Sequence, residues 1–359
     1  MLKVLIVGLG GIGQRHVRNL RALHGSEVEI LAYRARRLSH VVTPTLDVDR
    51  GRDVETEYDI AVFDRLEDAL AERPAMAFVC NPSSLHVPAA LMCARAGCDL
   101  FIEKPISHDL AGVSELLDEV QRRRRIVMVG YQFRFHPCFV ALERLVAERS
   151  LGTLLSVRAV IGEYLPGWHP YEDYRTMYAA RADLGGGVVL SQIHELDYLY
   201  ALFGLPRRLF AVGGHLSHLE IDVEDVASSL MEFHVDGHVL PVHLHQDYLQ
   251  RPASRSCEVL GSRGKALTDF PSLSLTRYDA DGVPESRTWD TWTRNEAFLD
   301  ELRHFLECVQ TRRQPVVDLV DGIASLRMAL AVKASMASGR VIALERSEGY
   351  ALGRAVNAR

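Results

Sequence analysis

The first 24 residues contain a pattern that few folds can accommodate. Residues 2–7 form an apolar run typical of a buried strand, and this run leads directly into Gly8, Gly10 and Gly13. Apolar residues with helical spacing follow. A strand, a G-x-G-x-x-G turn and a helix in this order predict the first βαβ unit of a parallel sheet that binds a dinucleotide. Gly8 would permit the tight turn, Gly10 the approach of a pyrophosphate, and Gly13 the close packing of helix on sheet.

Strand and helix patterns alternate up to about residue 130, which predicts an α/β domain of the doubly wound Rossmann type. Beyond this point strand patterns dominate, and they favour a second, α+β domain with a large, mainly antiparallel open sheet. Asp236-Gly237 lies between two such strands and indicates a tight hairpin. We therefore expect a dinucleotide-binding domain at 1–130 and a substrate-binding and oligomerisation domain at 131–359.

The expected elements are as follows. Strands are predicted at 2–7, 28–33, 59–63, 75–80, 99–102, 126–130, 154–162, 208–215, 226–235, 238–249, 256–260 and 273–278. Helices are predicted at 12–23, 65–72, 85–96, 108–124, 187–203, 297–311 and 321–338, the last closed by Gly339.

Composition excludes several other classes of protein. With 48% hydrophobic and 25% charged residues the chain is an ordinary globular one. A net charge of −6 argues against a nucleic-acid partner. No apolar stretch approaches the ~20 residues that span a bilayer. Six cysteines without a C-x-x-C pair indicate free thiols and a cytoplasmic location.

The residues after the second strand bear on which dinucleotide binds. An NAD site has an acidic residue there, bonded to the ribose 2′-hydroxyl. This sequence instead has Arg34, Arg36 and Arg37, and no acidic residue returns until Asp47. Because arginine suits a 2′-phosphate, the sequence favours NADP(H) over NAD(H). The alternative is that these arginines merely reflect a chain in which only four of 41 basic residues are lysine.

One of those lysines, Lys104, follows a predicted strand directly, at the carboxyl edge where open α/β sheets bind ligands. Lys104 lies in one of four short segments that occur along the chain. The four segments are Glu103-Lys104-Pro105, Asn81-Pro82-Ser83-Ser84-Leu85-His86, Gly130-Tyr131-Gln132-Phe133-Arg134-Phe135, and Gly185-Gly186-Gly187 followed by His194 and Asp197. Together they resemble the motifs of the Gfo/Idh/MocA family over nearly the whole chain.

That resemblance implies a two-domain NAD(P)-dependent oxidoreductase that acts on the secondary alcohol or ketone of a sugar. It implies cofactor contacts from Gly8, Gly10, Gly11, Ile12, Gly13, Arg34, Arg36, Arg37, Asn81, Pro82, His86, Glu103, Lys104 and Gln132. It implies substrate contacts from Lys104, Arg134, Tyr164, Trp168, Tyr174, Arg175, Ser191, His194 and Asp197. It also implies a homodimer or homotetramer formed through the second sheet, and no metal.

His194 and Lys104 are the expected catalytic residues. Hydride transfer from an alcohol needs a base for the hydroxyl proton, and histidine titrates near neutral pH. Lys104 would polarise the substrate oxygen or relay a proton. From the residues alone, His194 could equally be a buried helix histidine bonded to Asp197. Many relatives carry Asp where this chain has Ser191, so a mechanism that needs a carboxylate there is in doubt.

The segment 168–175 combines aromatic rings with polar groups, including Trp168, Tyr174 and Arg175. Such a mixture suits a sugar, and Arg175 suits a carboxylate or phosphate. The segment resembles a family branch acting on activated or acidic sugars, but it could also be a surface loop packed on its own aromatics. Two other functions stay open, an NAD-dependent glycoside hydrolase of the same fold and a non-catalytic nucleotide or sugar sensor.

His243, His245 and Asp247 alternate along one predicted strand, which invites comparison with a metal site. We expect instead a solvated or subunit-facing side of the sheet.

Overall fold

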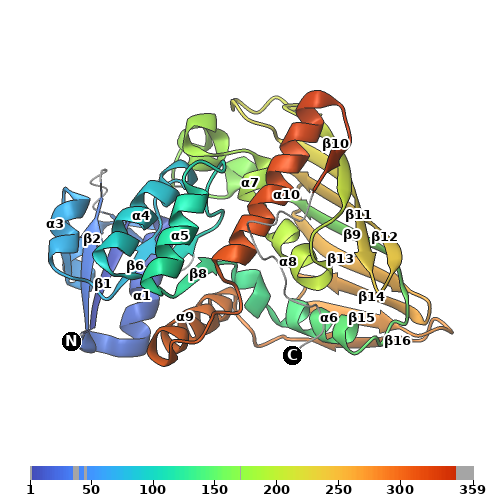
Figure 1. Ribbon diagram of the computed structural model, residues 1–359, viewed down its shortest axis with the longest axis horizontal. Coiled ribbons are helices and arrows are strands. Elements are labelled where there is room, and N and C mark those ends of the chain that lie inside the picture. The colour runs from blue at the N-terminus through green and yellow to red at the C-terminus, as the bar shows by residue number, and fades with distance from the viewer. Residues whose placement is uncertain (1, 35–39, 44–46, 170, 345–359) are drawn as a thin grey trace.

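A computed structural model describes residues 2–34, 40–43, 47–169 and 171–344. It places two large sheets side by side, with helices between and around them (Figure 1). The amino-terminal sheet has the strand order β5-β2-β1-β6-β7-β8, and every pairing is parallel. Its strands are β1 (Leu2–Val7), β2 (Val28–Tyr33), β5 (Ile60–Phe63), β6 (Met76–Val79), β7 (Asp99–Glu103) and β8 (Val127–Gly130). The order reverses between β1 and β6, which confirms the doubly wound sheet and locates its ligand-binding crevice.

Both faces of this sheet are covered. Along β1 the side chains alternate, so that Leu5 and Val7 join one apolar cluster while Val4 and Ile6 join another. The first face is covered by α3 (Leu66–Ala71), α4 (His86–Ala96) and α5 (Val113–Arg123). The second is covered by α1 (Gly11–His24), α2 (Val54–Tyr58) and α9 (Arg294–Thr311). A small hairpin, β3 (His40–Val42) and β4 (Val48–Asp53), lies beyond β2 in the chain.

Helix α9 comes from the carboxyl-terminal part of the chain, yet it packs on the amino-terminal sheet. Its Phe305 ring contacts the rings of Phe78 and Phe101, each at 5.6 Å between centroids. Asn295 at its start donates a hydrogen bond to Asn19 of α1 at 3.0 Å. The second half of the chain therefore completes the covering of the first sheet.

Within residues 2–344, as far as the structure describes them, the second sheet has nine strands in the order β16-β15-β14-β13-β9-β12-β11-β10-β17. They are β9 (Leu154–Gly162), β10 (Arg208–Gly214), β11 (Val226–Val235), β12 (His238–Asp247), β13 (Ser254–Gly261), β14 (Gly264–Asp269), β15 (Ser274–Tyr278), β16 (Pro284–Thr288) and β17 (Ile342–Ala343). Only β9 and β12 pair in parallel. Asp236 and Gly237 both have positive φ, 50° and 82°, which confirms the hairpin between β11 and β12.

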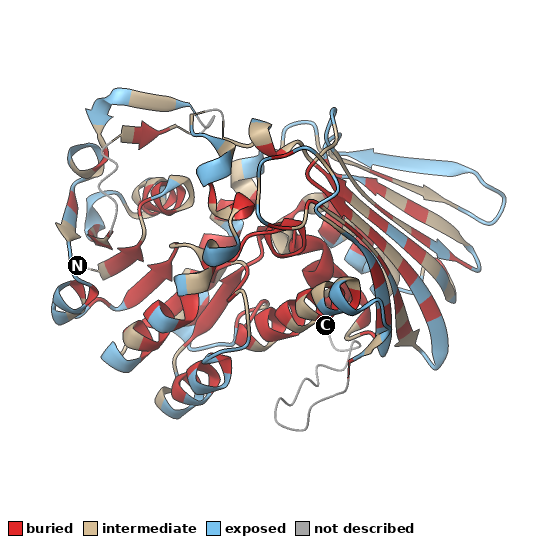
Figure 2. Ribbon diagram, turned by 90° about the horizontal axis from the view of Figure 1, so that it is seen from above, coloured by how far each residue is buried: buried red, intermediate tan, exposed pale blue. Residues whose placement is uncertain are grey.

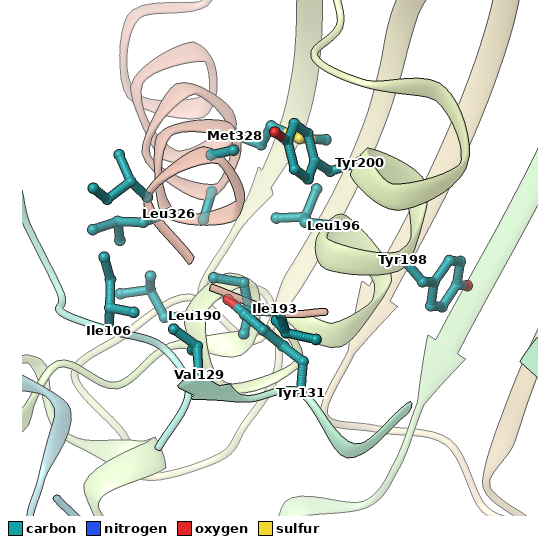
Figure 3. Close-up of a cluster of buried hydrophobic side chains, with 14 of the residues drawn as sticks. Ile106, Val129, Tyr131, Leu190, Ile193, Leu196, Tyr198, Tyr200, Leu326 and Met328 are labelled. Atoms are coloured by element: carbon teal, nitrogen blue, oxygen red, sulfur yellow. The ribbon is translucent and has the colours of Figure 1, made fainter. Parts of the chain in front are cut away.

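Among the described residues, helices cover one face of this sheet and leave the other uncovered (Figure 2). They are α6 (Pro137–Ala147), α7 (Val188–Ser191), α8 (His194–Phe203) and α10 (Leu319–Ser338), the last closed by Gly339 at φ 64°. Tyr131, Ile193, Leu196 and Leu326 pack together where α8 and α10 meet the end of β8 (Figure 3). No helix within the described residues is long and apolar enough to cross a bilayer.

The structure differs from the sequence predictions in several elements. The helix expected at 187–203 is interrupted at Gln192 and Ile193, giving α7 and α8. The helix expected at 108–124 begins only at Val113, after Gly112 in a left-handed conformation. Helix α6 and strands β14 and β16 were not predicted from the sequence. The six cysteines are buried and unpaired, as expected.

Candidate active site

The glycine turn joins β1 to α1 at the carboxyl edge of the first sheet. Gly8 has φ 101°, and a Cβ there would lie 2.9 Å from the backbone nitrogen of Asn81. A Cβ at Gly13 would lie 2.0 Å from the carbonyl oxygen of Gly8, whereas one at Gly10 would meet nothing within 4 Å. No side chain from the described parts of the chain caps the N-terminus of α1. Free N–H groups at Gly11 and beyond, above an open approach at Gly10, fit the pyrophosphate of a dinucleotide.

Three arginines were expected beside the adenosine ribose of the dinucleotide, and one of them, Arg34, lies within the described residues. Arg34 follows β2 directly, is buried, and forms an ion pair with Glu55 at the start of α2. Arg36 and Arg37 lie outside the described residues. Arg34 is therefore near the edge where the adenosine ribose would bind, but an acidic side chain already contacts it.

The turn that follows β6 is tied to the turn that follows β7 by His86. One ring nitrogen of His86 lies 2.7 Å from the carbonyl oxygen of Asn81 and the other 2.7 Å from that of Pro105. Burial lowers the pKa of His86, against the opposing effect of both carbonyl oxygens. Asn81, Pro82 and His86 thus lie beside the turn that carries Glu103 and Lys104, and both ring nitrogens of His86 contact main-chain carbonyl oxygens.

Glu103 ends β7, and its carboxylate lies 2.7 Å from Nε2 of His16 on α1. This histidine was not predicted as a site residue, although a polar side chain in the buried stripe of a helix was the available signal. Glu301 of α9 is also buried, and neither of its carboxylate oxygens has a hydrogen-bond partner. Burial, and then the charges of Glu103 and Asp197, raise the pKa of Glu301 well above its usual range.

Lys104 and His194 come together across the junction of the two sheets. The interruption between α7 and α8 releases the carbonyl of Ser191 from helical bonding, and Lys104 Nζ donates to this oxygen at 2.8 Å. His194 begins α8, is 4% exposed, and its Nδ1 has no hydrogen-bond partner. Burial lowers the pKa of His194 well below its usual value, and the charge of Lys104 lowers it further. The imidazole is therefore neutral near pH 7, as a proton acceptor must be.

Asp197 does not bond to His194. It lies at the next turn of α8 and binds Arg134 at both oxygens, at 2.7 and 3.0 Å, with the hydroxyl of Ser325 at 3.4 Å. Both charged side chains are almost fully enclosed. This arrangement corrects the possibility of a structural His194–Asp197 bond. Arg134 and Asp197 therefore neutralise each other's charge. A bidentate contact is the strongest that an arginine and a carboxylate form.

A second enclosed pair, Arg255 and Glu195, was not predicted. Arg255 donates to both carboxylate oxygens of Glu195, at 2.8 and 3.1 Å, and its guanidinium lies over the ring of Phe133 at 4.0 Å. That ring also contacts His194, at 5.0 Å between centroids. Gln132, expected to contact the nicotinamide, is buried beside Phe133 in the 3₁₀ turn η3 (Gln132–Phe135).

The substrate residues expected between 164 and 175 lie on a loop with several short 3₁₀ turns. The guanidinium carbon of Arg251 lies 3.9 Å from the centroid of the Tyr164 ring. The rings of Trp168 and Tyr248 lie 5.3 Å apart between centroids. The Tyr174 hydroxyl accepts a bond from the backbone of Glu220 at 3.2 Å. These contacts hold the loop against the second sheet.

Arg175, on the same loop, is at the surface, where Asp173 and Glu220 bind its guanidinium. Its charge is therefore engaged by acidic neighbours instead of facing the crevice unpaired. Tyr171 of this loop lies next to the start of α1 in the amino-terminal domain. It was not among the site residues predicted from the sequence. A Cβ at Gly11 would lie 3.0 Å from the Tyr171 hydroxyl, and burial raises the pKa of Tyr171 to about 12.

Two other features do not take part in the contact between Lys104 and the start of α8. His243 bonds to Ser228 and His245 to Asp247, on the outer side of β12. A pocket of about 760 Å³ lies at the opposite, amino edge of the first sheet. Its lining residues are Leu2, His24, Glu27, Met76, Leu306, Val309 and Gln310.

Comparison with known proteins agrees with this geometry. Residues 2–131 match the model of an oxidoreductase family with an NAD-binding Rossmann fold, and residues 139–267 match the GFO/IDH/MocA C-terminal domain. Trans-1,2-dihydrobenzene-1,2-diol dehydrogenase from Bos taurus is 26% identical over 88% of this chain and 91% of its own length. Myo-inositol 2-dehydrogenase from Thermotoga maritima is 24% identical over 97% of this chain and its full length.

Among solved structures, GenD2 from gentamicin A biosynthesis, in complex with NAD, superposes with a TM-score of 0.77 at 23% identity and 96% coverage of both chains. At this identity the likeness concerns the fold. The two matched segments together span well over half of the chain and carry the glycine turn, Lys104 and His194. The chain therefore belongs to the Gfo/Idh/MocA family of NAD-binding oxidoreductases.

Proposed function

We propose that this protein is an NAD(P)-dependent dehydrogenase that interconverts a secondary alcohol and a ketone of a sugar or sugar derivative. The observation that carries the proposal is the meeting of Lys104 and a neutral, buried His194 beside the glycine turn. The names of the relatives support the substrate class, since both act on ring-borne hydroxyl groups.

A dinucleotide held at the glycine turn of Gly8, Gly10 and Gly13 would supply the hydride acceptor for oxidation of the carbinol carbon. His194 accepts the hydroxyl proton, because its imidazole is unprotonated near neutral pH. The ammonium of Lys104 stabilises the negative charge that develops on the substrate oxygen. The carbonyl of Ser191 holds that ammonium in place at 2.8 Å. In the direction of reduction, His194 returns the proton to the same oxygen.

Ser191 does not supply a carboxylate, so His194 moves the proton and Lys104 supplies the charge that stabilises the substrate oxygen, with no carboxylate base. Arg134 and Asp197 hold α8 against η3 in this proposal instead of contacting substrate. We assign 1–130 to dinucleotide binding and 131–359 to substrate binding, with α9 as a shared element.

For the cofactor we propose NADP(H) ahead of NAD(H). Arg34 supports this choice because no acidic residue ends β2, although Glu55 competes for its guanidinium. Dissociation constants for NADPH and NADH, measured by nicotinamide fluorescence, test it. We expect Arg34→Ala to weaken NADPH binding and leave NADH binding unchanged, and equal effects on both would contradict the choice.

We also propose that the protein works in the cytoplasm as a homodimer or homotetramer. Six free thiols suit a reducing compartment. Exposed apolar side chains on the outer face of the second sheet suit a second copy of the chain. Those side chains are Phe210, Val212, Leu230 and Val239, and we call them the outer-face patch.

The decisive experiment is nicotinamide absorbance during turnover, with NAD(H) and NADP(H) offered against free, acidic and nucleotide-activated sugars. Lys104→Ala should lower kcat by roughly 10²-fold or more while dinucleotide affinity changes little. Lys104→Arg is the matched control, since it keeps the charge but cannot release a proton. A flat trace with every sugar, from protein that binds dinucleotide, would favour the hydrolase or sensor.

A further inference from the structure

Two buried glutamine side chains join the interruption between α7 and α8 to the end of β12. Gln246 of β12 is 0% exposed, and its Nε2 donates to the main-chain carbonyl of Gln192 at 2.9 Å. Gln192 is 2% exposed, and its own Nε2 donates to the main-chain carbonyl of Asp247 at 2.9 Å. We call these two residues, with their reciprocal hydrogen bonds, the glutamine pair.

The position of Gln246 in the sheet suits an apolar side chain. Side chains alternate along β12, and Leu240, Val242 and Leu244 lie on the same buried side as Gln246. Within the described residues, neither side-chain oxygen of the glutamine pair has a hydrogen-bond partner. An amide buried with an unpaired oxygen destabilises a fold relative to an apolar side chain of similar size. What the amide of Gln246 supplies, and leucine could not, is the hydrogen bond to the Gln192 carbonyl.

That hydrogen bond affects the next carbonyl along the chain. In a continuous helix, the carbonyls of Ser191 and Gln192 would accept from the N–H groups four residues later. Here the Gln192 carbonyl is directed to β12, and the Ser191 carbonyl accepts a hydrogen bond from Lys104 Nζ at 2.8 Å. The contact with Lys104 uses the main chain of Ser191, so it does not depend on a carboxylate at this position.

The glutamine pair is anchored inside the second sheet, whereas Lys104 belongs to the first. Strand β12 is flanked on both sides, with Gln246 opposite Ala227 of β11 and Ile161 of β9. Such central strands are among the last parts of a protein to open locally. Lys104 follows β7 of the first sheet. The hydrogen bond from Lys104 to the Ser191 carbonyl therefore joins the two sheets, and the glutamine pair fixes its acceptor.

We propose that Gln246 is a positioning residue for Lys104 and acts through Gln192 and the carbonyl of Ser191. The proposal rests on the dehydrogenase function proposed above, in which the ammonium of Lys104 stabilises charge on the substrate oxygen. Without the donor of Gln246, the released carbonyls regain helical bonds and the Ser191 carbonyl turns away from Lys104. The ammonium then leaves its place, and a displacement of about 1 Å is enough to slow an enzyme strongly.

The first test needs no substrate, because the chain has only four lysines, Lys3, Lys104, Lys265 and Lys333. Trace acetylation of the full-length protein with acetic anhydride, followed by peptide mass spectrometry, gives a rate for each. An ammonium bonded to a carbonyl reacts slowly, because the bond favours the charged form. We expect Gln246→Met, which keeps the size and loses the donor, to acetylate about tenfold faster at Lys104. The other three rates should stay unchanged.

Thr268→Val is the matched control. Thr268 is a buried residue of β14 in the same sheet, and its hydroxyl donates to the main-chain carbonyl of Cys257 at 3.0 Å. This variant also loses a buried hydrogen bond to the main chain, but it should acetylate at Lys104 like the natural protein. An unchanged Lys104 rate in Gln246→Met would overturn the proposal, and so would an equal rise in both variants.

Gln192→Met removes the other half of the glutamine pair and should raise the Lys104 rate in the same direction. It provides the test if Gln246→Met does not fold. A Gln192→Met protein that folds and reacts like the natural one at Lys104 would then overturn the proposal.

The second test measures turnover of the sugar that the absorbance assay identifies. We expect Gln246→Met to lower kcat about tenfold with little change in KM or dinucleotide affinity. Gln246→Glu should retain more of its kcat at pH 6 than at pH 9, because a protonated carboxyl donates a hydrogen bond and an ionised one does not. An unchanged kcat in Gln246→Met would overturn the proposal. Faster Lys104 acetylation without turnover of any sugar would contradict only the dehydrogenase function.

Discussion

The first sheet is covered by helices on both faces, whereas the second has helices on one face and exposed apolar side chains on the other. In the first sheet only the strand ends are accessible, so its chemistry is confined to the carboxyl edge, at Gly8 to Gly13 and at Glu103 and Lys104. The second sheet contributes to the site from its covered side, through the start of α8. Its open side remains available for association. Whether helices cover both faces of a sheet or only one thus determines whether its strand ends or its open face can contact other molecules.

The largest effect is expected from breaking the Arg134–Asp197 pair on the covered side of the second sheet. Arg134→Met leaves the Asp197 carboxylate buried without a counter-charge, which destabilises proteins by about 3–5 kcal/mol. Urea unfolding measures the loss, and the double variant with Asp197→Asn should recover much of it. If Arg134→Met is as stable as the natural protein but has a raised KM, then Arg134 contacts substrate.

The next largest effect on stability is expected from variants of the glycine turn. These variants test the carboxyl edge of the first sheet separately from the second sheet. Gly13→Ala forces the Gly8 carbonyl to move, so we expect about 2–3 kcal/mol of lost stability and much weaker dinucleotide binding. Gly10→Ala meets no atom within 4 Å and should keep its stability, losing only affinity for the dinucleotide. Thermal unfolding and fluorescence titration separate the two. A Gly10→Ala protein with normal affinity would place the pyrophosphate elsewhere.

A smaller effect concerns Glu301, on the helix that closes the first sheet. Its folded pKa is raised, so the folded state retains a proton that the unfolded state releases above about pH 4.3. Its contribution to stability is therefore complete below that pH and declines as pH rises toward the folded pKa. We expect Glu301→Gln to match the natural protein at pH 4 and to exceed its stability by about 1–3 kcal/mol at pH 8.

Chemical unfolding across this pH range provides the measurement. If the two proteins lose stability in parallel between pH 4 and pH 8, Glu301 is ionised in the folded state. A partner for its carboxylate would then have to be found near Glu103.

The smallest effect on stability is expected on the open face. Leu230 is 57% exposed and pairs across strands with Phe210 within the outer-face patch. Leu230→Asp should change the free energy of unfolding by less than about 0.5 kcal/mol and yet shift the molecular mass in light scattering toward the monomer. Val283→Asp, at an equally exposed residue outside the patch, is the control. An unchanged mass in both variants would place any subunit interface on another surface.

Much of the dinucleotide-binding domain was predictable because its sequence patterns are local. The strand and the glycine turn follow one another within residues 2–13, and Lys104 directly follows its strand. In the second sheet the pattern showed the hairpin at Asp236-Gly237. It did not show β14, β16 or α6, since short strands with polar exposed residues resemble loops. The interruption of the helix at Gln192 also escaped detection, because its cause is the bonding of the released carbonyls to Lys104 and Gln246.

The sequence by itself determined the parallel sheet and the dinucleotide turn, since each depends on residues close together in the chain. Lys104 and His194 became candidates through the motifs that resemble a known family. Only the tertiary structure decided which charges are paired. It joined Asp197 to Arg134, His16 to Glu103 and Arg175 to surface carboxylates, and it placed the guanidinium of Arg15 over the ring of Phe298. The physical reason is that charge pairing depends on distances between segments far apart in sequence, which no local pattern encodes.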